Sequence, residues 1–168
     1  MPLYQNGAFV ADPYTRFADD APLPPSGDVI VPVARWRREP EAVAARAGRT
    51  GVSIAAGENW DDLVPALLTL PLIALVFPKY TDGRAFSTGR QLRERCDYKG
   101  EIRAVGDVLL DEIPLMIRCG FDSFDVSDER TIRALERGHV PKVSLFYQPA
   151  LGVEAPAGTR PWLRRRAG

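Results

Sequence analysis

Residues 72–95 read LIALVFPKYTDGRAFSTGRQLRER, and this stretch decides the fold. Its first six residues form an unbroken apolar run, which is typical of a parallel strand covered on both faces. Pro78 then ends the strand, and the sequence becomes polar, with Ser87 or Thr88 placed to cap a helix. The stretch therefore predicts a buried strand followed directly by a helix, which is one βα unit.

The same alternation continues on both sides of this stretch. Further strands are predicted at 29–36, 52–56, 101–105, 122–126 and 142–147, and helices at 39–48, 59–70, 107–119 and 128–138. Parallel strands need a crossover connection, and the helices supply it. The sequence therefore predicts an α/β fold in which repeated βα units form a mainly parallel sheet. Whether this sheet is open or is a partial barrel stays undecided at this point.

Prolines and caps mark the ends of these elements. Pro65 and Pro114 fall inside predicted helices, where each removes a backbone N–H and should kink or restart the helix. Asp107 and Asp128 stand at the starts of two predicted helices, where a carboxylate can accept a backbone N–H. Gly120 is placed to end the helix over 107–119.

Composition divides the chain into three parts. Residues 1–50 include the proline-rich stretch DDAPLPPSGD, and we expect an irregular arm, a strand and a short helix packed on the core. Residues 51–148 carry the regular alternation and form the predicted α/β core domain. Residues 149–168 are rich in Pro, Ala and Gly and end in an arginine cluster, so we predict a flexible basic tail.

The overall composition is ordinary for a soluble globular protein. Apolar residues make up 45% and charged residues 26% of the 168 residues, and Lys+Arg and Asp+Glu balance at 22 each. This balance gives no field that would attract nucleic acid or an anionic membrane, so we expect neither as a partner. The longest apolar run is too short to span a bilayer and the N-terminus lacks a signal-peptide pattern, so we expect a cytoplasmic protein.

The sequence shows no evident cofactor or metal motif. Cys96 and Cys119 are the only cysteines, and two thiols cannot supply the four thiolates of an ordinary iron–sulfur cluster. No phosphate-binding glycine motif follows a strand, and no nucleophile elbow accompanies His139, the single histidine. Two reduced, partly buried thiols are the simplest interpretation, with a disulfide or redox role as the alternative.

Ligands of parallel α/β sheets bind beyond the carboxyl ends of the strands, and the segments 78–87, 104–107 and 125–130 lead there. A guanidinium and free helix N–H groups at that edge suit a small oxyanion or a phosphate. Caps and turns explain the same residues structurally, and no catalytic residue is assigned. We expect the cations and carboxylates of these segments to share one pocket. The candidate ligand-binding residues are Lys79, Asp82, Gly83, Arg84, Ser87, Gly106 and Asp107.

The pieces FPKYTDGR, LRER, YKGEIRAVGDVL and RCGFDSFDV together resemble an uncharacterised bacterial family, the domain of unknown function 934 (DUF934). The similarity is strong from Leu72 to Gln148. Members of this family are described as oxidoreductases involved in sulfite reduction, and they are similar to proteins encoded beside assimilatory sulfite reductase. The resemblance therefore implies a cytoplasmic role in sulfur assimilation, leading towards cysteine biosynthesis.

What the resemblance implies about activity is an accessory role. Proteins reduce sulfite with sirohaem, iron–sulfur clusters or flavins, and this chain shows no motif for holding them. We therefore predict a protein that assists sulfite reductase or its electron donor rather than one that carries the redox centre. The alternative is a small-oxyanion-binding enzyme or sensor that uses the strand-end loops. A third reading, a homodimer that completes a larger barrel, also stays open.

Overall fold

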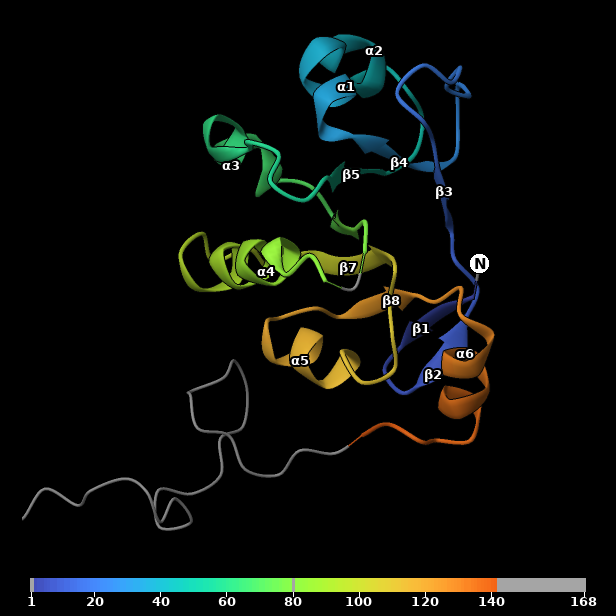
Figure 1. The fold of residues 1–168 in the computed structure, drawn as a ribbon. Coiled ribbons are helices and arrows are strands. Elements are labelled where there is room, and N and C mark those ends of the chain that lie inside the picture. The colour runs from blue at the N-terminus through green and yellow to red at the C-terminus, as the bar shows by residue number, and fades with distance from the viewer. Residues whose placement is uncertain (1, 80, 142–168) are drawn as a thin grey trace, which may run out of the picture.

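Six parallel strands in chain order form the centre of the sheet, as the repeated βα units predict. They are β3 (Tyr14–Arg16), β4 (Asp28–Pro32), β5 (Thr50–Ile54), β6 (Leu72–Phe77), β7 (Glu101–Gly106) and β8 (Ser123–Asp125). Each of these strands pairs in parallel with the next one along the chain. The computed structural model describes residues 2–79 and 81–141 (Figure 1), so the strand predicted at 142–147 and the tail at 149–168 lie outside the described residues.

The connections between these strands carry helices. These are α1 (Val33–Arg38), α2 (Pro40–Ala44), the 3₁₀ turn η1 (Asp61–Leu63), α3 (Val64–Leu67), α4 (Arg84–Glu94), α5 (Ile113–Arg118) and α6 (Glu129–Glu136). Sequential winding with right-handed crossovers places such helices on one face of the sheet. The main core accordingly joins Val52 and Ile73 of the strands to Leu92 and Met116 of the helices. No helix in the described part of the chain is long and apolar enough to cross a membrane.

An N-terminal hairpin extends the sheet beyond β8. β1 (Leu3–Gln5) pairs antiparallel with β8 and with β2 (Ala8–Val10). Asn6 and Gly7 form its turn with φ values of 52° and 84°, the conformation that a two-residue hairpin loop requires. The complete order is β2-β1-β8-β7-β6-β5-β4-β3. The strands of residues 1–50 and those of the predicted core domain therefore belong to one sheet.

The short link between the two edge strands forces this sheet to curl. Ala11, Asp12 and Pro13 alone separate β2 from β3, so Val10 and Tyr14 lie within about 14 Å of each other. Eight strands side by side in a flat sheet would hold their edges roughly 34 Å apart. The structure is therefore a partial barrel, which answers the question that the sequence left open.

The start of α4 differs from the sequence prediction. The helix begins at Arg84, with Gly83 as its N-cap residue, so Ser87 lies inside the helix and caps nothing. Thr88 does not cap it either, because its hydroxyl donates to the carbonyl of Arg84 within the helix. Gly83 has an ordinary φ of −79° and open space around it, so no tight backbone turn depends on this glycine.

The predicted helix over 107–119 is shorter than expected. Its helical part is α5, with Glu112 rather than Asp107 as the N-cap residue. Pro114 explains the late start, because a proline is tolerated only in the first turn, where its missing N–H has no partner to lose. Pro65 likewise lies in the first turn of α3, after η1, so both prolines restart their helices.

Other predicted boundaries are confirmed or moved by a few residues. Asp128 caps α6, and its carboxylate accepts the backbone N–H of Thr131 at 2.7 Å. Gly120 follows α5 with a φ of 93°, as a helix-ending glycine should. The strand predicted at 29–36 ends at Pro32, which is the last residue of an interior strand rather than part of an edge strand, and α1 follows it directly.

Candidate functional site

The concave face of the partial barrel carries a second, smaller core. Tyr14, Ile30, Leu72, Ala74 and Val105 are buried there, at strand positions that alternate with those facing the helices. Polar side chains occupy the two ends of this face. The end where the parallel strands begin is called the floor below, and the end where they finish is called the mouth.

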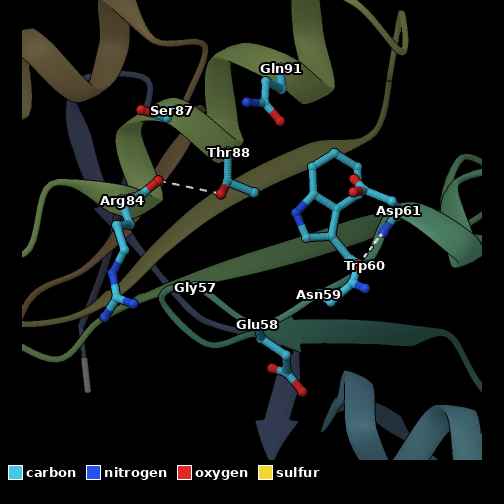
Figure 2. A pocket seen from close by; sticks show the side chains of 9 residues that line it. All are labelled: Gly57, Glu58, Asn59, Trp60, Asp61, Arg84, Ser87, Thr88 and Gln91. Atoms are coloured by element: carbon cyan, nitrogen blue, oxygen red, sulfur yellow. Dashed lines mark hydrogen bonds between the residues drawn. The ribbon is translucent and has the colours of Figure 1, made fainter.

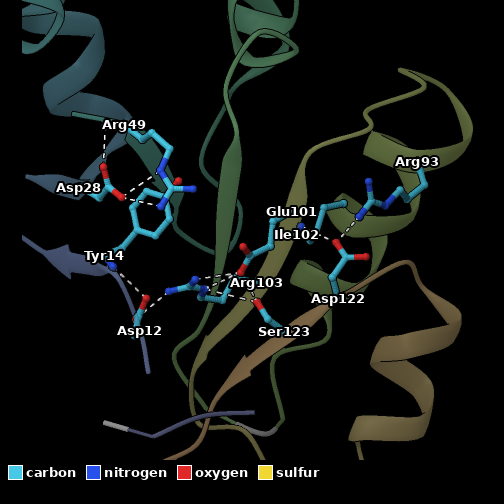
Figure 3. A network of polar contacts seen from close by, with 10 residues as sticks. All are labelled: Asp12, Tyr14, Asp28, Arg49, Arg93, Glu101, Ile102, Arg103, Asp122 and Ser123. Carbon is cyan, nitrogen blue, oxygen red and sulfur yellow. Dashed lines mark hydrogen bonds and ion pairs between the residues drawn. The ribbon is translucent and has the colours of Figure 1, made fainter. Parts of the chain in front are cut away.

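Arg103 is the centre of the floor, with a side chain that is 2% exposed. Its Nε donates to Glu101 Oε1 at 3.0 Å and to Ser123 Oγ at 3.3 Å, and its Nη1 donates to Asp12 Oδ2 at 2.8 Å (Figure 3). Its guanidinium carbon also lies 5.5 Å from the centre of the Tyr14 ring. We call Arg103 and these four partners the Arg103 network. The guanidinium of Arg103 has a partner on every side.

A second ion pair completes the floor beside Tyr14. The guanidinium carbon of Arg49 lies 4.9 Å from the centre of the Tyr14 ring, and its Nε and Nη2 donate to Asp28 Oδ2 at 2.9 and 2.6 Å. The side-chain hydrogen bonds from Arg49 lower the pKa of the Asp28 carboxyl, and burial raises the pKa of the Tyr14 hydroxyl. Asp28 is therefore ionised and Tyr14 neutral at neutral pH, so the floor has fixed charges.

At the mouth, the ends of four strands border a pocket of about 450 Å³, which we call the barrel-mouth pocket. The carboxyl ends of parallel strands are where barrels and open α/β sheets bind their ligands. The pocket lies within the range of volumes typical of small-molecule sites. Its lining residues are Arg16 of β3, Val76, Phe77 and Pro78 at the end of β6, Gly106 and Asp107 at the end of β7, and Ser127 after β8.

Gly106 is the position in this pocket where the backbone permits no side chain. Its φ is 101°, and a Cβ atom would lie 2.3 Å from the carbonyl oxygen of Phe77. That oxygen accepts the backbone N–H of Asp107 at 2.9 Å, so the approach is fixed by a hydrogen bond. Gly106 therefore fixes the backbone at this point of the pocket, while its role in binding a ligand stays a prediction.

Arg16 is the cation of the barrel-mouth pocket, and the sequence prediction missed it. Its Nη1 lies 3.6 Å from Asp125 Oδ2, which is an ion pair beyond hydrogen-bond distance, and its side chain is 40% exposed. The guanidinium makes no hydrogen bond within residues 2–79 and 81–141. Asp125 is more deeply placed, with 15% of its side chain exposed, and its buried Oδ1 also lacks a hydrogen-bond partner in those residues.

A second pocket, which we call the outer pocket, lies between α4 and the loop after β5 (Figure 2). Its volume is about 280 Å³. The residues of α4 that line it are spaced by three and four positions, so they form one face of the helix. The lining residues are Gly57, Glu58, Asn59, Trp60 and Asp61 of the loop, and Arg84, Ser87, Thr88 and Gln91 of α4.

Arg84, the cation predicted to bind an oxyanion, is already paired in the outer pocket. Its Nε donates to Asp82 Oδ1 at 2.9 Å and its Nη2 donates to Asp82 Oδ2 at 2.7 Å. These hydrogen bonds lower the pKa of Asp82 to about 2. Gly57 lies against the remaining Nη1 with a φ of 80°, and a Cβ there would be 2.2 Å from that nitrogen. Asp82 therefore occupies the fork that an oxyanion would need.

The predicted site residues divide between the two pockets, which share no lining residue. The curl of the sheet explains the division, because the strand ends point into the mouth while the face of α4 lies outside the sheet. Neither of these two pockets brings Lys79, Arg84 and Asp107 together. Of the predicted site residues, Gly106 and Asp107 line the barrel-mouth pocket, and Arg84 and Ser87 line the outer pocket. Asp82 pairs with Arg84, and Gly83 is the N-cap residue of α4. Lys79 is exposed and lines neither of these pockets.

The two cysteines lie away from both pockets. Cys96 and Cys119 are partly buried and are not joined to each other. Burial raises the pKa of the Cys119 thiol, which disfavours the reactive thiolate. In the part of the chain that the structure describes, no group of three or more His, Cys, Asp or Glu side chains is arranged to hold a metal ion.

Comparison with known proteins confirms the family that the sequence motifs indicate. The model of one family, described as a bacterial protein of unknown function (DUF934), matches residues 51–158. The chain belongs to the DUF934 family. No curated protein and no solved structure matches it. The matched range of this DUF934 protein begins in β5 and includes β6, β7 and β8, which supply most of the barrel-mouth pocket, whereas Arg16 lies before it.

The chemistry available to the DUF934 protein at its mouth is recognition of charge. Arg16 offers hydrogen-bond donors without partners among the described residues, and Asp107 and Asp125 bring negative charge to the same end of the barrel. Val76 and Pro78 add apolar surface, and Ser127 adds a hydroxyl. This combination of a few polar groups on an apolar wall is the composition of a small-ligand site.

Proposed function

We propose that this DUF934 protein is an accessory protein of assimilatory sulfite reduction that binds a small ligand in the barrel-mouth pocket. The ligand part of the proposal is carried by the convergence of four strand ends on Arg16, whose guanidinium has no hydrogen-bond partner among the described residues. The link to sulfite reduction rests on the resemblance of FPKYTDGR and YKGEIRAVGDVL to the family motifs.

An assisting role agrees better than a redox role with the small number of cysteines in the chain. Cys96 and Cys119 are the only cysteines of the chain, so one chain cannot ligate a four-thiolate cluster. We therefore propose that the electrons of sulfite reduction pass through sulfite reductase and its donor. The DUF934 protein would then support that system by binding a ligand and contacting one of those proteins in the cytoplasm.

Growth of a deletion strain tests this proposal. We expect the strain to grow slowly on sulfate or sulfite as the sole sulfur source and normally on sulfide, because sulfide is the product of the assisted step. The wild-type gene and Ser87→Phe should restore growth, while Ser127→Phe should not. Both serines are exposed and line a pocket, so this pair compares a blocked barrel-mouth pocket with a blocked outer pocket.

Two results would overturn the proposal in different ways. Parental growth of the deletion strain on sulfate and sulfite would exclude the accessory role. Full restoration by Ser127→Phe, with the variant folded by circular dichroism, would exclude the barrel-mouth pocket. The partner is tested separately, by asking whether purified sulfite reductase or its electron donor binds the purified DUF934 protein in sedimentation.

An oxyanion site at Lys79 and Arg84 stays the alternative, and the exposure of both side chains favours it. Binding there requires the anion to displace Asp82 from the guanidinium of Arg84. Calorimetric titration with sulfite, sulfate and phosphate tests it, with Arg84→Ala compared against Arg16→Ala. Binding that Arg84→Ala weakens and Arg16→Ala leaves unchanged would favour the alternative over the barrel-mouth pocket.

A further inference from the structure

We propose that a third pocket, an apolar groove on the helix-covered side of the sheet, is the docking site for residues 142–147 of the same chain. The groove lies between the turn of the N-terminal hairpin, the end of α5 and the residues after α6, and its volume is about 370 Å³. We call it the hairpin groove. Its lining residues are Tyr4, Asn6, Gly7, Ile117, Phe121, Asp122, Phe124 and Val140.

The walls of the hairpin groove are mainly aromatic and aliphatic. Tyr4, Phe121 and Phe124 line it and are also members of the main core. Ile117, at the end of α5, borders the same groove and is 50% exposed. A single exposed isoleucine is ordinary, but one that borders an apolar groove can bury more of its surface when a second apolar group enters. The groove therefore suits an apolar segment rather than a charged ligand.

The last described residues of the chain lie beside this groove. Val140 lines it, and Pro141 is the final residue that the structure describes (Figure 1). Residue 142 is therefore tethered next to the groove wall, and a six-residue segment reaches up to about 20 Å from there. A tethered segment meets its site at a high effective concentration, so a modest apolar contact is enough for docking.

The sequence that follows Pro141 has the composition that the groove requires. Residues 142–147 read KVSLFY, in which Val143, Leu145, Phe146 and Tyr147 are apolar or aromatic. The rest of the chain, residues 148–168, has its large apolar side chains spread among Pro, Gly, Ala and Arg. Burying the run at 143–147 removes a contiguous apolar surface from water, and this stabilises the docked state.

The sheet offers this segment no position beside β8. The repeated βα pattern predicts a strand at 142–147 after α6, but β8 already pairs with β7 on one side and with β1 on the other. The N-terminal hairpin thus occupies the place that the next parallel strand of the repeat would take. The outer edge of β2 is the competing position, whereas the hairpin groove is an apolar surface that the chain reaches directly after α6.

Methyl NMR of the full chain tests the docking directly. We expect nuclear Overhauser contacts between the methyl groups of Ile117 and those of Val143 or Leu145, in samples where both positions are labelled in the same chain. Absence of these contacts would overturn the proposal. Contacts that arise only between differently labelled chains would replace it with docking of a second copy, and backbone contacts of residues 142–147 with β2 would replace it with a ninth strand.

Aspartate substitutions test the same contact by its effect on stability. Leu145→Asp should lower the urea midpoint of the full chain and speed hydrogen exchange of the α5 amides by about tenfold or more, because a carboxylate is costly in an apolar groove. Leu151→Asp, the same change six positions later, should alter neither. Ile117→Asp should lower the midpoint more than Leu68→Asp, although Leu68 is also exposed, at 38%.

The double variant of Ile117→Asp and Leu145→Asp decides whether these two positions touch. If they do, the double variant should be little less stable than either single variant, because the first substitution has already removed the contact. Additive losses, or equal effects of Leu145→Asp and Leu151→Asp, would overturn the docking. The proposal is independent of the ligand at the barrel mouth, so these outcomes leave the accessory role as it stands.

Discussion

Both ends of the concave face carry arginine, and Arg103 at the floor and Arg16 at the mouth differ in how completely they are paired. Arg103 at the floor is 2% exposed and has partners in Asp12, Glu101 and Ser123. Arg16 at the mouth is 40% exposed and has one distant ion-pair partner among the described residues. A cation whose donors are all bonded stabilises the protein that surrounds it, whereas a cation with open donors is available to something else. The comparison separates a structural end of the barrel from the end at which we propose that a ligand binds.

The largest expected effect comes from breaking the floor. Arg103→Met should lower the free energy of unfolding by about 3 kcal/mol, because it leaves the carboxylates of Glu101 and Asp12 without their counter-charge in a largely buried place. Arg16→Met, the matched change at the mouth, should cost less than about 1 kcal/mol, as exposed ion pairs do. Urea denaturation of both variants measures the difference. Equal losses would mean that floor and mouth are not distinct.

Gly106 provides the next test, because it is the rigid point of the mouth. Gly106→Ala places a side chain at a φ of 101° and against the carbonyl oxygen of Phe77, so we expect a loss of about 2 kcal/mol in unfolding free energy. Gly7→Ala is the control, since Gly7 also has a positive φ but has open space around it. If Gly7→Ala lowers the unfolding free energy less than Gly106→Ala does, the difference is due to the close approach of Gly106 to Phe77. Equal losses for the two variants would show that this contact is unimportant.

The central elements could be predicted because their causes are local. The apolar run at 72–77 indicates a buried strand by itself, Asp128 indicates a cap, and the alternation of strands and helices indicates a parallel sheet. The start of α4 at Arg84 could not be predicted from the sequence, because its N-cap residue, Gly83, has no side chain that could cap a helix. Pro114 did carry a signal, since a proline favours the first turn, and the restart of the helix that it predicts is what the structure shows.

The place of Arg16 at the mouth could not be predicted because it depends on distant contacts. Arg16 reaches Asp125 only because the hairpin of β1 and β2 attaches to β8 and the short link to β3 then curls the sheet. The hydrogen bond between Asp12 and Arg103 spans 91 positions for the same reason. No local pattern in residues 1–50 specifies which strand they will meet. Gly106 and Asp107 were found from the strand-end rule, which needs only the order of strands and helices.

The smallest effect concerns Arg84, the arginine of the outer pocket. It decides whether Arg16 at the mouth is better placed than Arg84 to bind an anion. The hydrogen bonds from Arg84 hold the pKa of Asp82 at about 2, below the value of an unfolded chain, so the pair stabilises the protein above about pH 4 and loses this contribution as the pH falls through about 2. Arg84→Gln should raise the pKa of Asp82 towards its ordinary value, as measured by NMR titration of the carboxyl carbon. The pKa of Asp128, which is lowered mainly by the backbone N–H of Thr131, should not change. An unaltered Asp82 pKa in Arg84→Gln would mean that the Arg84 fork is open in solution, and the outer pocket would then equal the mouth as a place for an anion.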